Sequence, residues 1–258
     1  MSVRPARRLA ASVFTVGVLV TASGCLAGQH EKSARRAVPA ASAAGQLSPS
    51  PDPALTAAQA RAALITEADL GVPWGPTQGA ATWRDALLKA GTTAPACQQL
   101  LDALYADELL GQSPGAYAVT ALDDGDDQAQ LRYQVAADRR ADLDRTLAWL
   151  KTLPQTCAQF AAATTSAGPE TVRVYAAELP QVGDDRQGLR VTLTGETVGD
   201  DGEPATLTVD VAVVRVGDDA IVLTEGALGT PPSDAVGQAL ELGSRRLAQV
   251  REQGRAQA

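Results

Sequence analysis

The clearest pattern along the chain is the alternation of apolar and polar residues over short stretches. Alternation with a period of two is typical of β-strands that bury one face. The pattern predicts strands at 117–121, 131–135, 171–176, 189–194, 207–216 and 220–224. In the long stretch 207–216 the alternation breaks at Val213 and Val214. Either a β-bulge or burial of both faces of the strand would explain this break.

Around these strands, apolar residues recur at the helical spacing of three and four positions. The spacing predicts helices at 56–65 (N-cap Thr56), at 95–110, after the N-cap Asp138 and after the N-cap Ser233. Pro154 is predicted to begin a short helix that carries Cys157 and Phe160 on one face.

The order of the elements predicts the fold class. The connections between successive strands are short, and short connections join antiparallel neighbours, because a parallel pair needs a crossover of about a dozen residues or more. We therefore expect an α+β fold: a twisted antiparallel β-sheet with helices packed on it, preceded by a signal peptide and a disordered tether. The domain is expected to span residues 54–258.

The N-terminus has the three parts of a secretory signal peptide. Three arginines precede an apolar run at 9–20, which is shorter than the roughly 20 residues of a membrane-spanning helix. The run leads into Ala-Ser-Gly-Cys at 22–25, which resembles the lipobox of bacterial lipoproteins. The resemblance implies cleavage after residue 24 and attachment of lipid, including palmitate, to Cys25. The alternative is ordinary signal cleavage next to an unmodified cysteine.

Residues 25–53 are rich in Ala, Ser, Gly, Gln and Pro and show no apolar periodicity. This composition predicts a disordered tether between the lipid anchor and the domain.

The charge of the chain argues against nucleic acid as a partner. The whole chain has a formal net charge of −8, and removal of residues 1–24 takes away three arginines and no acids, which leaves −11. Such a surface repels nucleic acid and anionic headgroups. The scarcity of lysine beside abundant Ala, Arg, Gly and Asp is typical of a high-GC actinobacterium.

The predicted domain lacks most catalytic groups. The only histidine of the chain, His30, lies in the tether, so a Ser-His-Asp or Cys-His arrangement in the domain is excluded. We expect no catalytic residue, no cofactor and no metal site. The acidic run 123–127 lacks the spacing of a calcium-binding loop and suits a turn; calcium binding at the acidic turns is the alternative.

Two cysteines, Cys97 and Cys157, remain after Cys25. In an oxidising compartment such a pair predicts a disulfide. A zinc site is the alternative, and it would need further ligands.

The tryptophans are the candidate ligand contacts. Trp74 and Trp83 lie in the irregular segment 70–94, which is long for a loop within a compact domain. The hypothesis is that this segment forms one wall of a ligand cleft; the alternative is that both side chains cover the core. Trp149 lies on the side of its predicted helix that faces away from the leucines.

Four stretches resemble the PknH-like extracellular sensor domains: ALITEADL at 63–70, Cys97 at the start of a helix, CAQF at 157–160, and the strand–turn–strand at 213–222. The resemblance implies helices packed on an antiparallel sheet, with a cleft for an unidentified ligand. Receptor-type members carry two disulfides, whereas this chain can form one within the domain.

Together, the signal peptide and the resemblance imply a lipoprotein held on the outer face of the cell membrane by its lipid anchor. It would act as a non-enzymatic ligand-binding or sensing module for an unknown envelope ligand or protein partner. The alternative is a lipid or glycolipid carrier of the cell wall. A deep apolar cavity would favour the carrier, and a shallow polar cleft would favour the sensor.

Overall fold

The computed structural model describes residues 54–257 except 113–114, 127, 199–202 and 232–233. The predicted signal peptide, the tether, Cys25 and the capping role of Ser233 lie outside the described residues. In the described part of the chain, no helix is long and apolar enough to cross a membrane.

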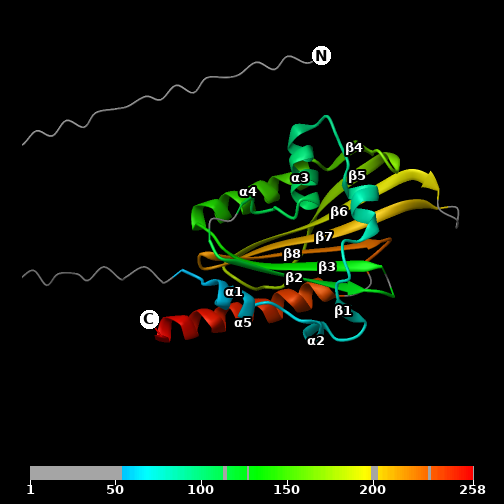
Figure 1. Cartoon of the computed structure of the whole chain (residues 1–258). Coiled ribbons are helices and arrows are strands. Elements are labelled where there is room, and N and C mark those ends of the chain that lie inside the picture. The colour runs from blue at the N-terminus through cyan, green and yellow to red at the C-terminus, as the bar shows by residue number, and fades with distance from the viewer. Residues whose placement is uncertain (1–53, 113–114, 127, 199–202, 232–233, 258) are drawn as a thin grey trace, which may run out of the picture. The chain divides into compact units, whose positions relative to one another are not determined.

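One antiparallel β-sheet organises the domain (Figure 1), and its eight strands lie in the order β1-β2-β3-β8-β7-β6-β5-β4. The strands are β1 (Trp74–Pro76), β2 (Tyr117–Asp124), β3 (Ala129–Ala137), β4 (Gln159–Thr164), β5 (Gly168–Ala177), β6 (Asp185–Val198), β7 (Pro204–Val216) and β8 (Asp219–Leu228). The predicted α+β class is confirmed, and the six predicted strands are all present. The pattern predicted neither of the two edge strands, β1 and β4.

Helices pack on both faces of the sheet (Figure 1). One face carries α3 (Pro95–Tyr105), α4 (Arg140–Thr156) and the short π-helical turn η1 (Arg84–Leu88). The other face carries α1 (Ala57–Ala62), α2 (Glu67–Leu70) and α5 (Ala235–Gln257). The segment predicted to be irregular thus contains α2, β1 and η1. Each face has its own apolar cluster, so the sheet lies between two cores.

The central strand β7 is buried on both faces. Val211 and Val213 belong to the cluster under α3 and α4, while Ala212 and Val214 belong to the cluster under α5. The register of β7 with β8 is continuous through these residues, and the irregularity between β6 and β7 falls at 194–198. Of the two explanations for the broken alternation, burial of both faces is therefore correct.

The boundaries of three predicted helices are wrong. The first helix ends at Ala62 and not near Ile65. The helix that begins at Pro95 ends at Tyr105 and not near 110, because Asp107 adopts a positive φ of 57°, which a right-handed helix does not allow. Pro154 does not begin a helix. It lies in the last turn of α4, and Phe160 belongs to β4.

The N-cap predicted for α1 is confirmed, and the N-cap predicted for α4 is wrong. Thr56 caps α1 as predicted, and Gln59 completes a capping box with it. Asp138 does not cap α4, since the N-cap residue is Arg139. The Asp138 carboxylate instead accepts a hydrogen bond from the adjacent amide of Arg139 at 2.7 Å.

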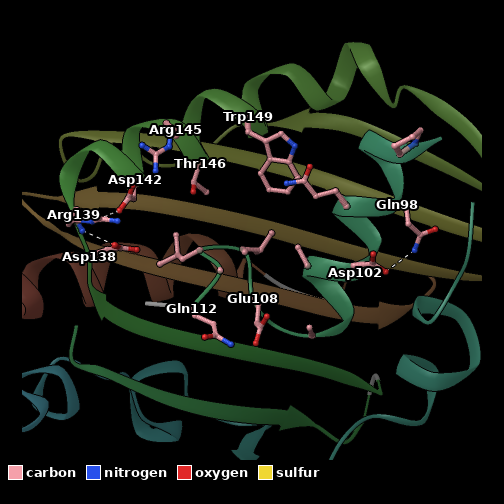
Figure 2. A pocket seen from close by; sticks show the side chains of 17 residues that line it. Gln98, Asp102, Glu108, Gln112, Asp138, Arg139, Asp142, Arg145, Thr146 and Trp149 are labelled. Carbon is pink, nitrogen blue, oxygen red and sulfur yellow. Dashed lines mark hydrogen bonds and ion pairs between the residues drawn. The ribbon is translucent and has the colours of Figure 1, made fainter. Parts of the chain in front are cut away.

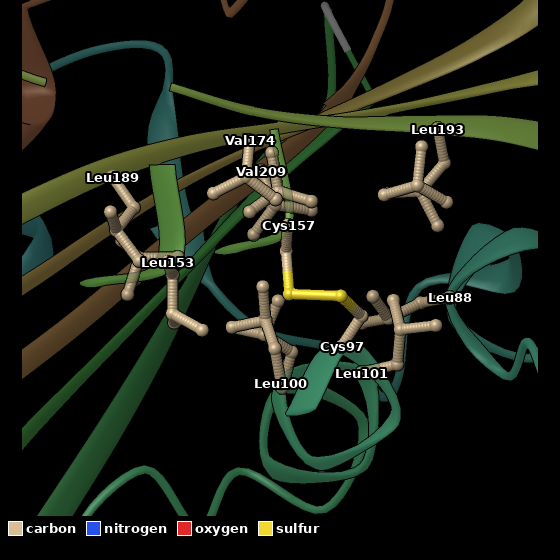
Figure 3. Close-up of a cluster of buried hydrophobic side chains, with 14 of the residues drawn as sticks. Leu88, Cys97, Leu100, Leu101, Leu153, Cys157, Val174, Leu189, Leu193 and Val209 are labelled. Carbon is tan, nitrogen blue, oxygen red and sulfur yellow. A yellow bond between two sulfur atoms is a disulfide. The ribbon is translucent and has the colours of Figure 1, made fainter. Parts of the chain in front are cut away.

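The predicted disulfide is present between Cys97 and Cys157, whose Cα atoms are 5.6 Å apart (Figure 3). Both cysteines are buried, with Leu100, Leu101 and Leu153 of the same cluster beside them. The bridge joins the first turn of α3 to the residue that ends α4. These two helices are therefore tied to one another by a covalent bond as well as by packing.

Candidate functional site

An open groove of about 900 Å³ lies between α3 and α4 (Figure 2). One wall comes from α3 and the other from α4 together with the two residues before it. The segment 106–112, which follows α3, lines a third side. We call this the α3–α4 groove.

Helical periodicity explains why both walls are polar. Each helix buries one apolar stripe in the core, so its opposite stripe faces the groove. The buried residues of α3 are Cys97, Leu100, Leu101 and Leu104, and those of α4 are Leu143, Leu147, Leu150 and Leu153. The stripes that line the groove are Gln98, Gln99, Asp102 and Ala103 on α3, and Asp142, Arg145, Thr146 and Trp149 on α4.

The third side of the groove is held in place by ion pairs from the sheet face. The Asp107 carboxylate lies 3.0 Å from Arg84 of η1 and 3.1 Å from Arg132 of β3, and all three side chains are mostly buried. Arg84 also donates a hydrogen bond to the carbonyl oxygen of Tyr105 at 2.8 Å, at the end of α3. These contacts fix the turn at which the chain leaves α3 and enters the groove.

The groove has an excess of negative charge. Four carboxylates line it, from Asp102, Glu108, Asp138 and Asp142, against two guanidinium groups, from Arg139 and Arg145. Both arginines form ion pairs with Asp142, at 2.6 Å in the case of Arg139. Both arginines share this one carboxylate, and the four carboxylates outnumber the two guanidinium groups, so the groove as a whole disfavours an anionic ligand.

Several polar groups in the groove have no partner within the protein. In the part of the chain that the structure describes, the side chains of Gln99, Glu108 and Gln112 and the indole N–H of Trp149 make no intramolecular hydrogen bond. Figure 2 shows the Trp149 ring projecting from α4 into the groove, with Glu108 and Gln112 across from it. The groove thus offers unused donors and acceptors together with one aromatic ring.

The structure places the predicted ligand contacts Trp74 and Trp83 apart. Trp74 is buried in the cluster under α5, and Trp83 is buried in the cluster under α3 and α4. Trp83 packs against Gly226 so closely that an added Cβ there would lie 2.3 Å from the ring. Neither tryptophan lines the α3–α4 groove, so a role for them in ligand capture stays a prediction.

Of the groove residues, Trp149 was the one that the sequence singled out, because helical spacing places it on the side of α4 that faces away from the leucines. The polar residues of 106–112 gave no such signal. Their place in the groove depends on Asp107, which pairs with residues 23 and 25 positions away in the sequence. Only the folded sheet brings these charges together.

A row of ionisable side chains crosses the face of the sheet that lies opposite to the α3–α4 groove. Arg190 of β6, Asp210 of β7 and Glu225 of β8 lie opposite one another in register. Arg190 binds both carboxylate oxygens of Asp210 at 2.7 Å. Glu225 is fully buried, and neither of its oxygens has a hydrogen-bond partner. Burial, reinforced by the nearby Asp210, raises the pKa of Glu225 to about 8.

Two further carboxyls are buried away from the groove. Burial raises the pKa of Glu170 to about 7. It raises the pKa of Asp219 to about 6, against the opposing effect of Arg251, which lies 3.1 Å away. None of the three acids with a raised pKa lines the α3–α4 groove.

Acidic residues at two of the turns, Asp123 and Asp184, form hydrogen bonds within the fold. Asp123 accepts hydrogen bonds from the amide of Gln78 at 3.0 Å and from the side chain of Gln130 at 2.8 Å, which fastens the segment after β1. Asp184 accepts a hydrogen bond from the amide of Gly217 at 2.7 Å. Among the described residues, no three His, Cys, Asp or Glu side chains gather closely enough to hold a metal ion.

Comparisons with known proteins found likeness among solved structures. No family model and no curated protein matches it. Among solved structures, it is similar to the crystal structure of the extracellular domain of PknH from Mycobacterium tuberculosis, with a TM-score of 0.44 and 14% sequence identity. The match covers 78% of this chain and 99% of that one. At this level of similarity the comparison assigns no ligand, partner or activity to this chain.

Proposed function

We propose that this protein is a lipid-anchored, extracytoplasmic module that binds a ligand in the α3–α4 groove and catalyses no reaction. The observation that supports this most directly is the groove itself. It is open, has a volume typical of ligand sites, and presents several polar groups that the protein does not use.

The side chains of the groove suit binding better than catalysis. None of the described residues that line it is a histidine, cysteine, serine or lysine. A general acid for glycoside hydrolysis requires a carboxyl with a raised pKa. The described carboxyls of that kind, Glu170, Asp219 and Glu225, all lie outside the groove.

The observations do not favour the alternative function of lipid carriage. Three smaller hollows lie beside the sheet: one of about 160 Å³ between β6, β7 and the start of α5, and two of about 10 Å³ each, under Trp83 and beside Leu109. The first is smaller than the roughly 300 Å³ at which ligand cavities begin, and each of the other two has space for about one water molecule. The large groove is open and lined with charged and amide groups, which favours the binding module.

Filling the groove tests this function. Ala106 is exposed and lines the groove, so Ala106→Trp is expected to occupy it without disturbing the core. Native mass spectrometry of the full protein, purified from its own envelope, should detect a bound species with the wild type. We expect at least about a tenfold lower occupancy with the variant, at an unchanged melting temperature.

The matched control is Ala248→Trp, which places the same side chain on an exposed position of α5, on the other face of the sheet. This control should retain the bound species. Equal occupancy in the wild type and in Ala106→Trp would rule out the groove as the binding site.

The lipid anchor is tested separately. Cys25→Ala is expected to abolish incorporation of radiolabelled fatty acid, because the substitution removes the thiol that would carry the lipid. The variant should also be released into the medium, since no other anchor is proposed. Membrane retention equal to that of the wild type in a fractionation experiment would contradict the proposal.

A further inference from the structure

We propose that the ligand of the α3–α4 groove is a neutral oligosaccharide. This inference rests on the function proposed above and specifies the chemical class of the ligand. It is carried by three features of the groove: its charge, its half-buried aromatic ring and its amide and carboxylate groups that have no partner within the described residues.

The charge of the groove disfavours anionic ligands. Four carboxylates line it, and the two arginines present are both engaged by Asp142. A phosphate, a sulfate or a uronic acid would approach more carboxylates than guanidinium groups, and the two arginines already share the carboxylate of Asp142. An uncharged ligand avoids this cost.

Trp149 provides the surface that a sugar ring needs. Its side chain packs partly against the cluster of α3 and α4, which fixes the orientation of the indole, and the rest of the ring projects into the groove (Figure 2). The C–H face of a pyranose or furanose ring packs against an aromatic face and buries apolar area. Ala103 and Ala106 are small and leave space for such a ring on the α3 side.

The unpaired groups match the hydroxyls of a sugar. Each hydroxyl both donates and accepts hydrogen bonds. Gln99 and Gln112 offer amide donors and acceptors, and Glu108 offers two carboxylate acceptors, all without a partner within the described residues. A planar amide or carboxylate can engage two adjacent hydroxyls at once. A purely apolar ligand would leave these groups unpaired on binding.

The test is titration of the full chain with neutral oligosaccharides of two to six residues, namely glucans, mannans, galactans and arabinans. Uronic acid oligosaccharides of the same lengths are the charged comparison. We expect at least one neutral series to bind with a Kd below about 1 mM, and the uronic acid series to bind at least about tenfold more weakly. Calorimetry measures both.

Substitutions of groove residues test whether the oligosaccharide binds in the α3–α4 groove. Trp149→Ala is expected to weaken the Kd by about tenfold or more, while Trp149→Phe, which keeps an aromatic face, should weaken it less. Gln112→Leu should weaken binding, whereas its matched control Gln249→Leu, at an exposed position of α5, should not. Unchanged affinity in both Trp149→Ala and Gln112→Leu would overturn the proposal. So would uronic acid oligosaccharides that bind as tightly as neutral ones.

Together with the Ala106→Trp experiment, the titration distinguishes a failure of this inference from a failure of the proposed function. If Ala106→Trp displaces a native ligand but no neutral oligosaccharide binds, the function stands and the inference is wrong. If a neutral oligosaccharide binds, the same sugar on a neutral glycolipid in phosphatidylcholine vesicles decides its source. Binding to these vesicles with an affinity at least equal to that for the free sugar identifies a lipid headgroup, and weaker binding identifies a soluble or wall-linked glycan.

Discussion

Removal of the Cys97–Cys157 bridge is expected to lower the free energy of unfolding by about 4 kcal/mol. The two cysteines are 60 residues apart in the sequence, and a cross-link over a loop of that length restricts the unfolded chain by about this amount. Both cysteines are buried among leucines, so their replacement by alanine introduces no polar group into the core. Denaturant unfolding of Cys97→Ala/Cys157→Ala beside the wild type measures the change.

Reduction provides the control for this prediction. A reducing agent should lower the stability of the wild type to about that of the double variant and leave the variant itself unchanged. A difference of less than about 1 kcal/mol between the wild type and the variant would contradict the prediction. In that case packing alone would hold α3 against α4.

The bridge also has an expected effect on the groove. It joins the start of α3 to the end of α4, and these helices form two of the groove's three sides. Loss of the bridge should therefore raise amide hydrogen exchange in α3 and α4 more than in α5, which lies on the other face of the sheet. Ligand affinity should fall along with this loss of order.

The strands could be predicted where one side chain in two is apolar. Apolar and polar residues alternate clearly in β5 and β6. The alternation did not predict the two edge strands, β1 and β4. β1 has only three residues, including Gly75 and Pro76, which is too short for a period to show. β4 contains three consecutive alanines, which suit a helix as well as a strand. It becomes a strand because it pairs with β5, and this pairing is not visible in the local sequence.

The candidate site was predictable only in part. The position of Trp149 on the polar side of α4 follows from helical periodicity. The third side of the groove does not, because its geometry depends on the positive φ of Asp107 and on Arg84 and Arg132 from elements far along the chain. The burial of Trp74 and Trp83 likewise depends on which face of the sheet each segment crosses.

The second large effect is expected at Glu225, where Glu225→Gln should stabilise the domain at neutral pH. The carboxyl is fully buried, and its pKa in the folded protein is about 8 against 4.5 for an exposed glutamate. Unfolding therefore releases a proton between these values, and the stability of the wild type falls as the pH rises from about 4.5 to 8. At pH 7 the shift corresponds to roughly 3 kcal/mol, as an upper figure.

Glutamine has the shape of the protonated acid and cannot ionise, so the variant should lose this part of the pH dependence. Asp210, Asp124 and Asp234 oppose ionisation of Glu225 and Arg190 favours it, and the substitution leaves all four in place. Urea unfolding at pH 4, 6 and 8 should show similar stability at pH 4 and a growing advantage of the variant above pH 5. The control Glu252→Gln, at an exposed position of α5, should follow the wild type at every pH. If Glu225→Gln is less stable than the wild type at pH 8, the buried carboxylate is ionised and compensated in the folded protein.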